Sequence, residues 1–294
     1  MKLLLVGADS AVGRALSDQM QQRGIEAVVP DEEIDVHDPI SAARVITRGE
    51  PDQVINLVSY GAGSQLADYR AEQEPERCDE LNHQYPALLA QVCDHLTIPL
   101  LHLSSSHVFS GGKKLAYTEQ DKTGPIGVYG RTALAGEQAI ADTMESWVIV
   151  RAGWLFGKGQ DEFIRSWLQE VVETDGSITT RRCRFSPTPV EDLARVILAI
   201  ALQIDCDARV WGVYHYCAAD SRKESEFARE VIRMAARRDE SIYRLLDHLS
   251  VSPVRVEAPD MANATLSSKK VFDTFGIKQR PWQASLEQLI TSYS

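Results

Sequence analysis

The sequence lacks three features that mark several large classes of protein. Its five cysteines are odd in number and lack the spacing of metal or redox motifs, which favours reduced, buried thiols over a disulfide framework. No apolar run is long enough to cross a bilayer, and the run that ends at Gly7 is too short for a secretory signal. Lysine and arginine total 31 against 42 aspartate and glutamate, and the net charge of −11 opposes nucleic-acid binding. We therefore expect a cytoplasmic protein with no metal site and with neither a membrane nor a nucleic acid as a partner.

Apolar strand patterns alternate with helical patterns along the 294 residues. Residues 3–6 form a continuous apolar run, which is typical of a parallel strand buried on both faces. Residues 51–58, 98–103 and 147–151 are further predicted strands. Residues 40–47 and 163–172 have helical periodicity. A chain with 44% hydrophobic and 25% charged residues has an ordinary globular composition and can form one large domain or two.

A glycine-bearing turn joins the first predicted strand to a helix. Gly7 and Gly13 flank it, Ser10, Ala11 and Val12 lie between them, and the helix begins at residues 14–16. The backbone N–H groups of such a turn and helix N-terminus are suited to a pyrophosphate. The alternative is a turn that only packs the strand on the helix and binds no ligand.

A second predicted strand, at residues 25–29, ends in an acidic turn that contains Asp31. A carboxylate at this place can accept hydrogen bonds from an adenosine ribose and repels a 2′-phosphate. No Lys or Arg is close in the sequence, so we expect NAD to be favoured over NADP. The alternative is a solvated acidic turn.

Three serines, at 104–106, follow the fourth predicted strand, and Tyr129 begins a later helix. A serine hydroxyl that donates a hydrogen bond, together with a phenol that donates a proton, can polarise a carbonyl group. The phenol needs a nearby cation to become acidic enough, and position i+4 on a helix would supply it. Here that position is Ala133. We therefore expect Tyr129 to be a poorly activated acid.

Residues 128–137 read VYGRTALAGE. They resemble the Tyr-x-x-x-Lys segment of extended short-chain dehydrogenase/reductases, in the dTDP-4-dehydrorhamnose reductase branch, where it reads VYGKTKLAGE. Both lysines are replaced, the catalytic one by Ala133. The resemblance extends over the chain and implies an α/β fold, a Rossmann-like doubly wound parallel sheet with a small C-terminal substrate-side subdomain. It assigns 1–157 to an NAD(P)-binding Rossmann domain, to which 187–216 return, and 158–186 with 217–294 to the subdomain.

The resemblance also implies the roles of individual residues. It makes Ser105 and Tyr129 the catalytic pair. The implied cofactor-binding residues are Gly7, Ser10, Ala11, Val12, Gly13, Asp31, Asp35, Val36, Val58, Ser59, Asn82 and Tyr129.

Most candidate substrate-binding residues lie in segments that depart from the family pattern. His107 can bind substrate or share a proton, or it is a packed loop residue. Arg182 and Arg184 can pair with a diphosphate, or they lie on a solvated strand. Ser106 and Trp154 complete the set.

These patterns leave several functions open. The first is a protein that binds NAD or NADP and a sugar nucleotide, with reductase activity weakened or lost. The second is a catalytically silent regulatory subunit, resembling that of methionine adenosyltransferase, and the third is an active 4-keto sugar nucleotide reductase. Loss of cofactor binding altogether is a further alternative, and a protein partner or a homodimer is compatible with each.

Overall fold

A sheet of six parallel strands forms the centre of the computed structural model, which describes residues 1–61, 67–254 and 261–293. The spatial order of its strands is β2-β1-β3-β4-β5-β10. They are β1 (Lys2–Val6), β2 (Glu26–Val28), β3 (Gln53–Asn56), β4 (Leu100–Ser105), β5 (Trp147–Ala152) and β10 (Gly212–Tyr216). The strand order reverses between β1 and β3, and ligands of such sheets bind beside the carboxyl ends of the strands at this point.

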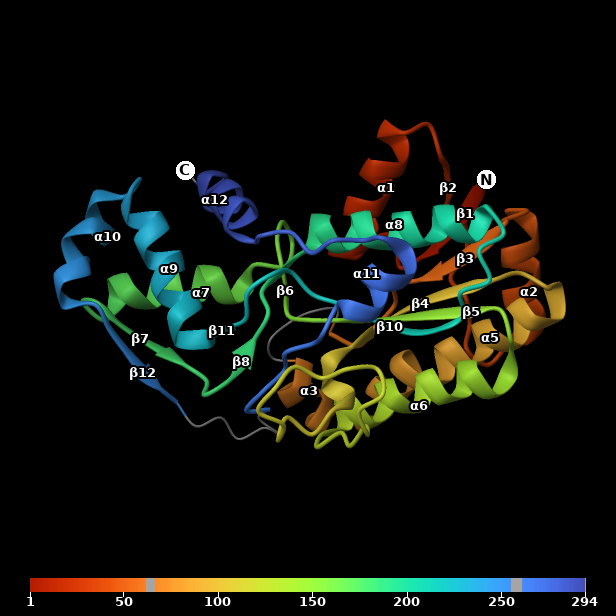
Figure 1. The fold of residues 1–294 in the computed structure, drawn as a ribbon, viewed down its shortest axis with the longest axis horizontal. Coiled ribbons are helices and arrows are strands. Elements are labelled where there is room, and N and C mark those ends of the chain that lie inside the picture. Colours follow the sequence, from red (N-terminus) through yellow and green to blue (C-terminus); the bar gives the residue numbers. More distant parts are fainter. Residues whose placement is uncertain (62–66, 255–260, 294) are drawn as a thin grey trace.

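Helices cover both faces of the sheet (Figure 1). Leu3 and Leu5 of β1 pack in one hydrophobic cluster with α1, α8 and α11, whereas Leu4 and Val6 pack on the opposite side with α2, α5 and α6. This alternation follows from the period of two along a strand and explains why β1 is apolar throughout. The helices are α1 (Ala11–Gln22), α8 (Val190–Asp205), α11 (Lys269–Phe275), α2 (Pro39–Arg48), α5 (Tyr85–Leu96) and α6 (Val128–Thr143). The predicted doubly wound α/β fold is confirmed.

Short elements connect β3 to α5 and β4 to α6. Between β3 and α5 the described chain forms α3 (Ala67–Gln73), α4 (Pro75–Asp79) and a π-helical turn, η1 (Glu80–Gln84). A 3₁₀ turn, η2 (Ser106–Val108), follows β4 directly. Turns of the π type are frequent at functional sites because they displace side chains from the regular helical register.

A second body lies beside the carboxyl ends of the strands, on the left of Figure 1. Its core is an aromatic cluster in which the ring of Phe227 contacts those of Phe156, Phe185, Trp167 and Trp282. Its elements are β6 (Leu155–Phe156), α7 (Glu162–Glu173), β7 (Ser177–Thr180), β8 (Arg184–Phe185), β9 (Thr188–Pro189), β11 (Arg222–Lys223), α9 (Glu224–Ala236), α10 (Glu240–Leu245), η3 (Leu246–His248), β12 (Ser250–Pro253) and α12 (Gln283–Thr291). The polypeptide enters this body just after β5, so the space between the two bodies begins where the strands end.

Four of the five cysteines are buried, Cys206 is exposed, and all five are free thiols. None of the helices described is both long and apolar enough to cross a lipid bilayer.

Candidate active site

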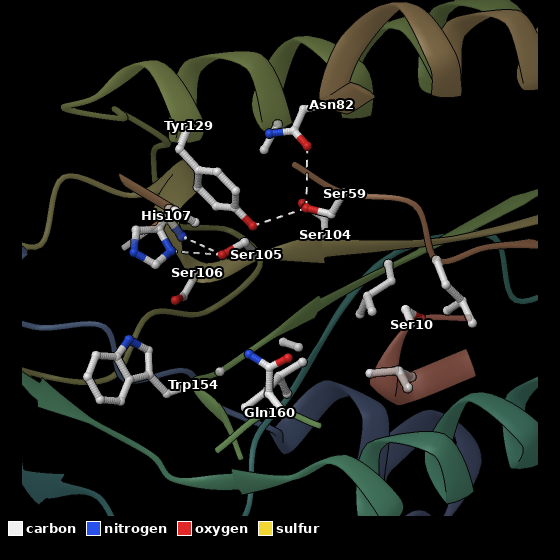
Figure 2. Close-up of a pocket in the computed structure, with 18 of the residues that line it drawn as sticks. Ser10, Ser59, Asn82, Ser104, Ser105, Ser106, His107, Tyr129, Trp154 and Gln160 are labelled. Carbon is white, nitrogen blue, oxygen red and sulfur yellow. Dashed lines mark hydrogen bonds between the residues drawn. The ribbon is translucent and has the colours of Figure 1, made fainter. Parts of the chain in front are cut away.

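A cavity opens at the carboxyl ends of β1, β3, β4 and β5, facing the second body (Figure 2). It encloses about 1040 Å³ of empty space, part of which is open to solvent. Side chains from both bodies line it: Ser10, Ala11, Val12, Leu57, Val58, Ser59, Ala67, Asp68, Asn82, His102, Leu103, Ser104, Ser105, Ser106, His107, Tyr129, Ala133, Ala152, Gly153, Trp154, Leu155, Gln160 and Arg181. The cavity therefore lies at the place where sheets of this type bind ligands.

The turn after β1 is closed tightly around glycine. Gly7 has φ +83°, and a Cβ on Gly13 would lie 2.4 Å from the Gly7 carbonyl oxygen. The Ser10 hydroxyl donates to the Gly7 carbonyl at 2.7 Å and accepts from the Gly13 N–H at 3.0 Å. Ser10 thus caps α1, and its side chain stays within the turn. The N-terminus of α1 lies at the cavity wall and fits the pyrophosphate of a dinucleotide.

Replacing Gly13 with Ala is expected to abolish dinucleotide binding and to lower the unfolding temperature. The added methyl group would collide with the backbone of Gly7 and Ala8, and overpacking of this kind costs about 1–3 kcal/mol. Fluorescence titration with NADH and thermal unfolding measure the two effects. Gly112→Ala is the matched control, because a Cβ there meets nothing closer than the Ser110 hydroxyl at 3.8 Å. Equal NADH affinity in both variants would contradict the assignment of this turn.

The expectation that no basic side chain lies near the acidic turn at 31–33 is wrong. Arg48 of α2 lies 3.4 Å from Asp31 and 2.9 Å from Glu32, and Arg44 pairs with Glu32 at 3.3 Å. The sequence hides these pairs because the arginines lie more than ten positions away along the chain. The carboxylates are therefore partly neutralised, which weakens the argument for NAD over NADP.

Asp31, Asp35 and Val36, which were predicted to bind the cofactor, all lie outside the lining of the cavity. Asp35 accepts a hydrogen bond from the His37 backbone N–H at 2.9 Å, and Val36 packs on the cluster beneath β1. Their roles stay predictions.

Asn82 holds the strand end beside Tyr129. Its side-chain oxygen accepts from the Tyr60 backbone N–H at 2.7 Å and from the Ser59 hydroxyl at 3.3 Å. The Ser59 hydroxyl lies 3.2 Å from the Tyr129 hydroxyl (Figure 2). Asn82 belongs to η1, so the π turn directs its amide toward the segment that follows β3. The predicted Ser59, Asn82 and Tyr129 are therefore brought together.

Burial makes the Tyr129 phenol less acidic. It raises the pKa to about 12, the negative charge of Asp68 acts in the same direction, and hydrogen bonds from Ser59 and Ser105 oppose both effects. Ala133 lies one turn further along α6, is 7% exposed and lines the same cavity. Among the described lining residues the only Lys or Arg is Arg181.

The sequence did not single out Asp68, which joins His107 and Ser105 in a continuous chain of polar contacts. His107 Nδ1 lies 2.9 Å from Ser105 Oγ, and its Nε2 lies 3.0 Å from Asp68 Oδ2. Asp68 projects from α3 and is 9% exposed. No local motif marks this aspartate, because its contact with His107 spans 39 positions and arises only in the fold.

Arg181 is the arginine of its segment that reaches the cavity. Its guanidinium lies over the Trp154 ring at 4.7 Å and 3.9 Å from Asp68 Oδ2. Arg182 is exposed, and Arg184 donates to the Ser221 hydroxyl at 3.0 Å. The structure thus places the predicted Trp154 in the lining, whereas Arg182 and Arg184 lie outside it.

Comparisons with known proteins agree with this architecture. The family model described as RmlD substrate binding domain matches residues 1–294. A dTDP-4-dehydrorhamnose reductase of Sinorhizobium fredii is 27% identical over 295 residues, covering 99% of this chain and 97% of that relative. A Clostridium acetobutylicum dTDP-4-dehydrorhamnose reductase structure has a TM-score of 0.84 at 24% identity and covers 100% of this chain and 99% of its own. The Bacillus anthracis reductase, solved in complex with NADP, has a TM-score of 0.80 at 21% identity, with 99% of each chain covered.

Proposed function

The chain belongs to the RmlD substrate binding domain family, and from this premise we propose that it binds a nicotinamide dinucleotide and a sugar nucleotide in the described cavity. Reduction of a 4-keto sugar through Tyr129 is weakened or lost in this proposal. The observation that carries it is the cavity itself. It extends from the N-terminus of α1, past Ser105 and Tyr129, to Trp154 and Arg181.

Each part of the cavity has a distinct role in this proposal. The α1 N-terminus would hold the pyrophosphate of a dinucleotide, and Ser59 with Asn82 would position the segment after β3 that lines the cavity. The bound dinucleotide supplies a hydride. Arg181, which lies against the indole of Trp154, is placed to pair with a diphosphate of the sugar nucleotide.

The weak step is the proton transfer. The Ser105 hydroxyl can donate a hydrogen bond to the keto oxygen, but Tyr129, with its pKa of about 12, is a poor acid near neutral pH. This pKa also favours the second candidate, a binding protein without turnover that regulates a partner, because such a protein has no need of an acidic phenol.

Titration with NADH and NADPH tests the proposed binding. We expect both to bind, with NADH favoured by less than about tenfold, or ~1.4 kcal/mol, because Arg48 partly offsets the repulsion of a 2′-phosphate by Asp31. Fluorescence or calorimetric titration measures the two affinities, and stopped assays with a dTDP-4-keto-6-deoxy sugar measure turnover. Absence of binding by both dinucleotides would refute the proposal. Turnover of simple ketones but not of sugar nucleotides would refute the proposed substrate class.

A further inference from the structure

We propose that His107 is the proton source of this site and passes its proton through Ser105 to the substrate oxygen, with Asp68 as the positioning residue. This inference rests on the proposed function and deepens it. It assigns the acid that Tyr129 cannot provide to a group that is already connected to the Ser105 hydroxyl.

The geometry of the three residues forms a relay. Figure 2 shows the His107 ring beside Ser105. Dashed lines join the Ser105 hydroxyl to the backbone nitrogen of His107 and to a nitrogen of its ring. Nδ1 lies 2.9 Å and the backbone nitrogen 3.3 Å from Ser105 Oγ. On the other side of the ring, Nε2 lies 3.0 Å from Asp68 Oδ2. The carboxylate has no hydrogen of its own to donate, so it accepts from Nε2–H in both charge states of the ring.

The charge on His107 decides which way the Ser105 hydrogen points. In the neutral ring Nδ1 is an acceptor, and the Ser105 hydroxyl donates to it. In the imidazolium Nδ1 carries a hydrogen and donates to Ser105 Oγ. The Ser105 hydrogen is then released from Nδ1 and can turn toward a substrate oxygen in the cavity. Only the charged ring therefore prepares Ser105 to donate to a keto oxygen.

In the resulting step the substrate carbonyl group takes up one hydride and one proton. A C–H bond forms at the carbonyl carbon, and the electron pair of the C=O π bond moves to the oxygen. That oxygen takes the Ser105 hydroxyl hydrogen while Ser105 takes the Nδ1 proton. His107 ends neutral, still donates to Asp68, and regains its proton from water, so the sum is ketone, hydride and proton giving an alcohol.

Two charged groups of opposite sign lie around His107. They are Asp68 from α3 and Arg181 from the segment after β7. Tyr129 of α6 is a further titratable neighbour, and its ring stands edge-on to the His107 ring at 5.3 Å between centroids. Burial alone would raise the pKa of Asp68, but His107 and Arg181 together hold it below its ordinary value. Asp68 is therefore ionised near neutral pH. The Asp68 carboxylate lies closer to the imidazole than to the Arg181 guanidinium, which is 3.9 Å from Asp68 Oδ2.

The pH dependence of kcat/KM distinguishes this relay from an acid at Tyr129. With His107 as the proton source, kcat/KM falls about tenfold per pH unit once the imidazolium loses its proton. With Tyr129 as the source it stays level up to the alkaline range, because the phenol keeps its proton until about pH 12. His107→Asn should lower kcat/KM at pH 6 by at least about tenfold and abolish the slope. His83→Asn is the matched control, because His83 also pairs with an aspartate at 3.0 Å but lies outside the cavity lining.

A second measurement needs no turnover. In ¹⁵N-histidine NMR spectra of the full chain, Asp68→Asn should move the His107 titration to lower pH by about one unit or more, since it removes the opposite charge. Neutral His107 should carry its hydrogen on Nε2. A neutral ring protonated on Nδ1, or a titration that Asp68→Asn leaves in place, overturns the relay. Turnover with a pH profile that His107→Asn does not alter, or dinucleotide binding without turnover at any pH, also overturns it. Failure to bind dinucleotide would instead refute the proposed function.

Discussion

Replacing Ala133 with Lys is expected to raise keto-sugar turnover by about 10²-fold at neutral pH. The substituted side chain shares a helix face with Tyr129 and enters the cavity that Ala133 lines. A cation within about 4–6 Å lowers the pKa of an acid by about 1–3 units, which opposes the effect of burial on the phenol. The expected gain is at the lower end of the range for general acid catalysis, about 10²–10⁴-fold. Steady-state kinetics and ultraviolet titration of Tyr129 measure both effects.

A lysine elsewhere on α6 separates this effect from a general change of charge. Gln138 is exposed and lies outside the cavity lining, so Gln138→Lys should leave turnover unchanged. In an Ala133→Lys background, His107→Asn should lower turnover less than it does in the native chain, because a second proton source is then available. If Ala133→Lys shifts the Tyr129 titration but not turnover, proton transfer is not the step that limits this protein.

The central sheet was predictable because its signals are local. The apolar run at 98–103 corresponds to β4 (Leu100–Ser105), and the helix predicted at Tyr129 is α6, which begins at Val128 in the structure. Each strand carries its own pattern of burial and the turn after β1 carries its own glycines, so neither requires knowledge of a distant residue.

The parts of the site that escaped prediction depend on contacts between distant segments. Asp68 became significant only when α3 placed it against His107, and Arg48 reached Asp31 only when α2 packed beside β2. The arginine cluster shows the same limit on a smaller scale. Three arginines lie within four positions, but only Arg181 faces the cavity, because neighbouring residues of an extended segment point in different directions.

The support beneath the serine run is also non-local. Glu137 of α6 and Arg151 of β5 are 4% and 5% exposed and form a two-pronged ion pair. Arg151 Nε donates to Glu137 at 2.8 Å and Nη2 at 2.6 Å, and the Ser104 hydroxyl donates to the same carboxylate at 2.5 Å. The pair therefore ties the end of β4 to α6, next to Ser105.

Glu137→Ala is expected to lower the free energy of unfolding by about 3–5 kcal/mol, the loss typical when one member of a buried ion pair is removed. Arg151 would keep its charge in the interior, where its other contacts include the Phe109 ring at 5.1 Å and a ring nitrogen of His215 at 3.4 Å. Urea unfolding at neutral pH measures the loss.

An exposed glutamate provides the comparison. Glu240 pairs with Arg244 on the surface of α10, and Glu240→Ala should cost less than about 1 kcal/mol because water solvates both charges. Similar losses in the two variants would mean that the interior pair contributes no more to the free energy of unfolding than a surface pair does. A large loss for Glu137→Ala alone would mean that the charge pair buried behind the cavity, to which Ser104 is hydrogen-bonded, contributes far more to folding than an exposed pair does.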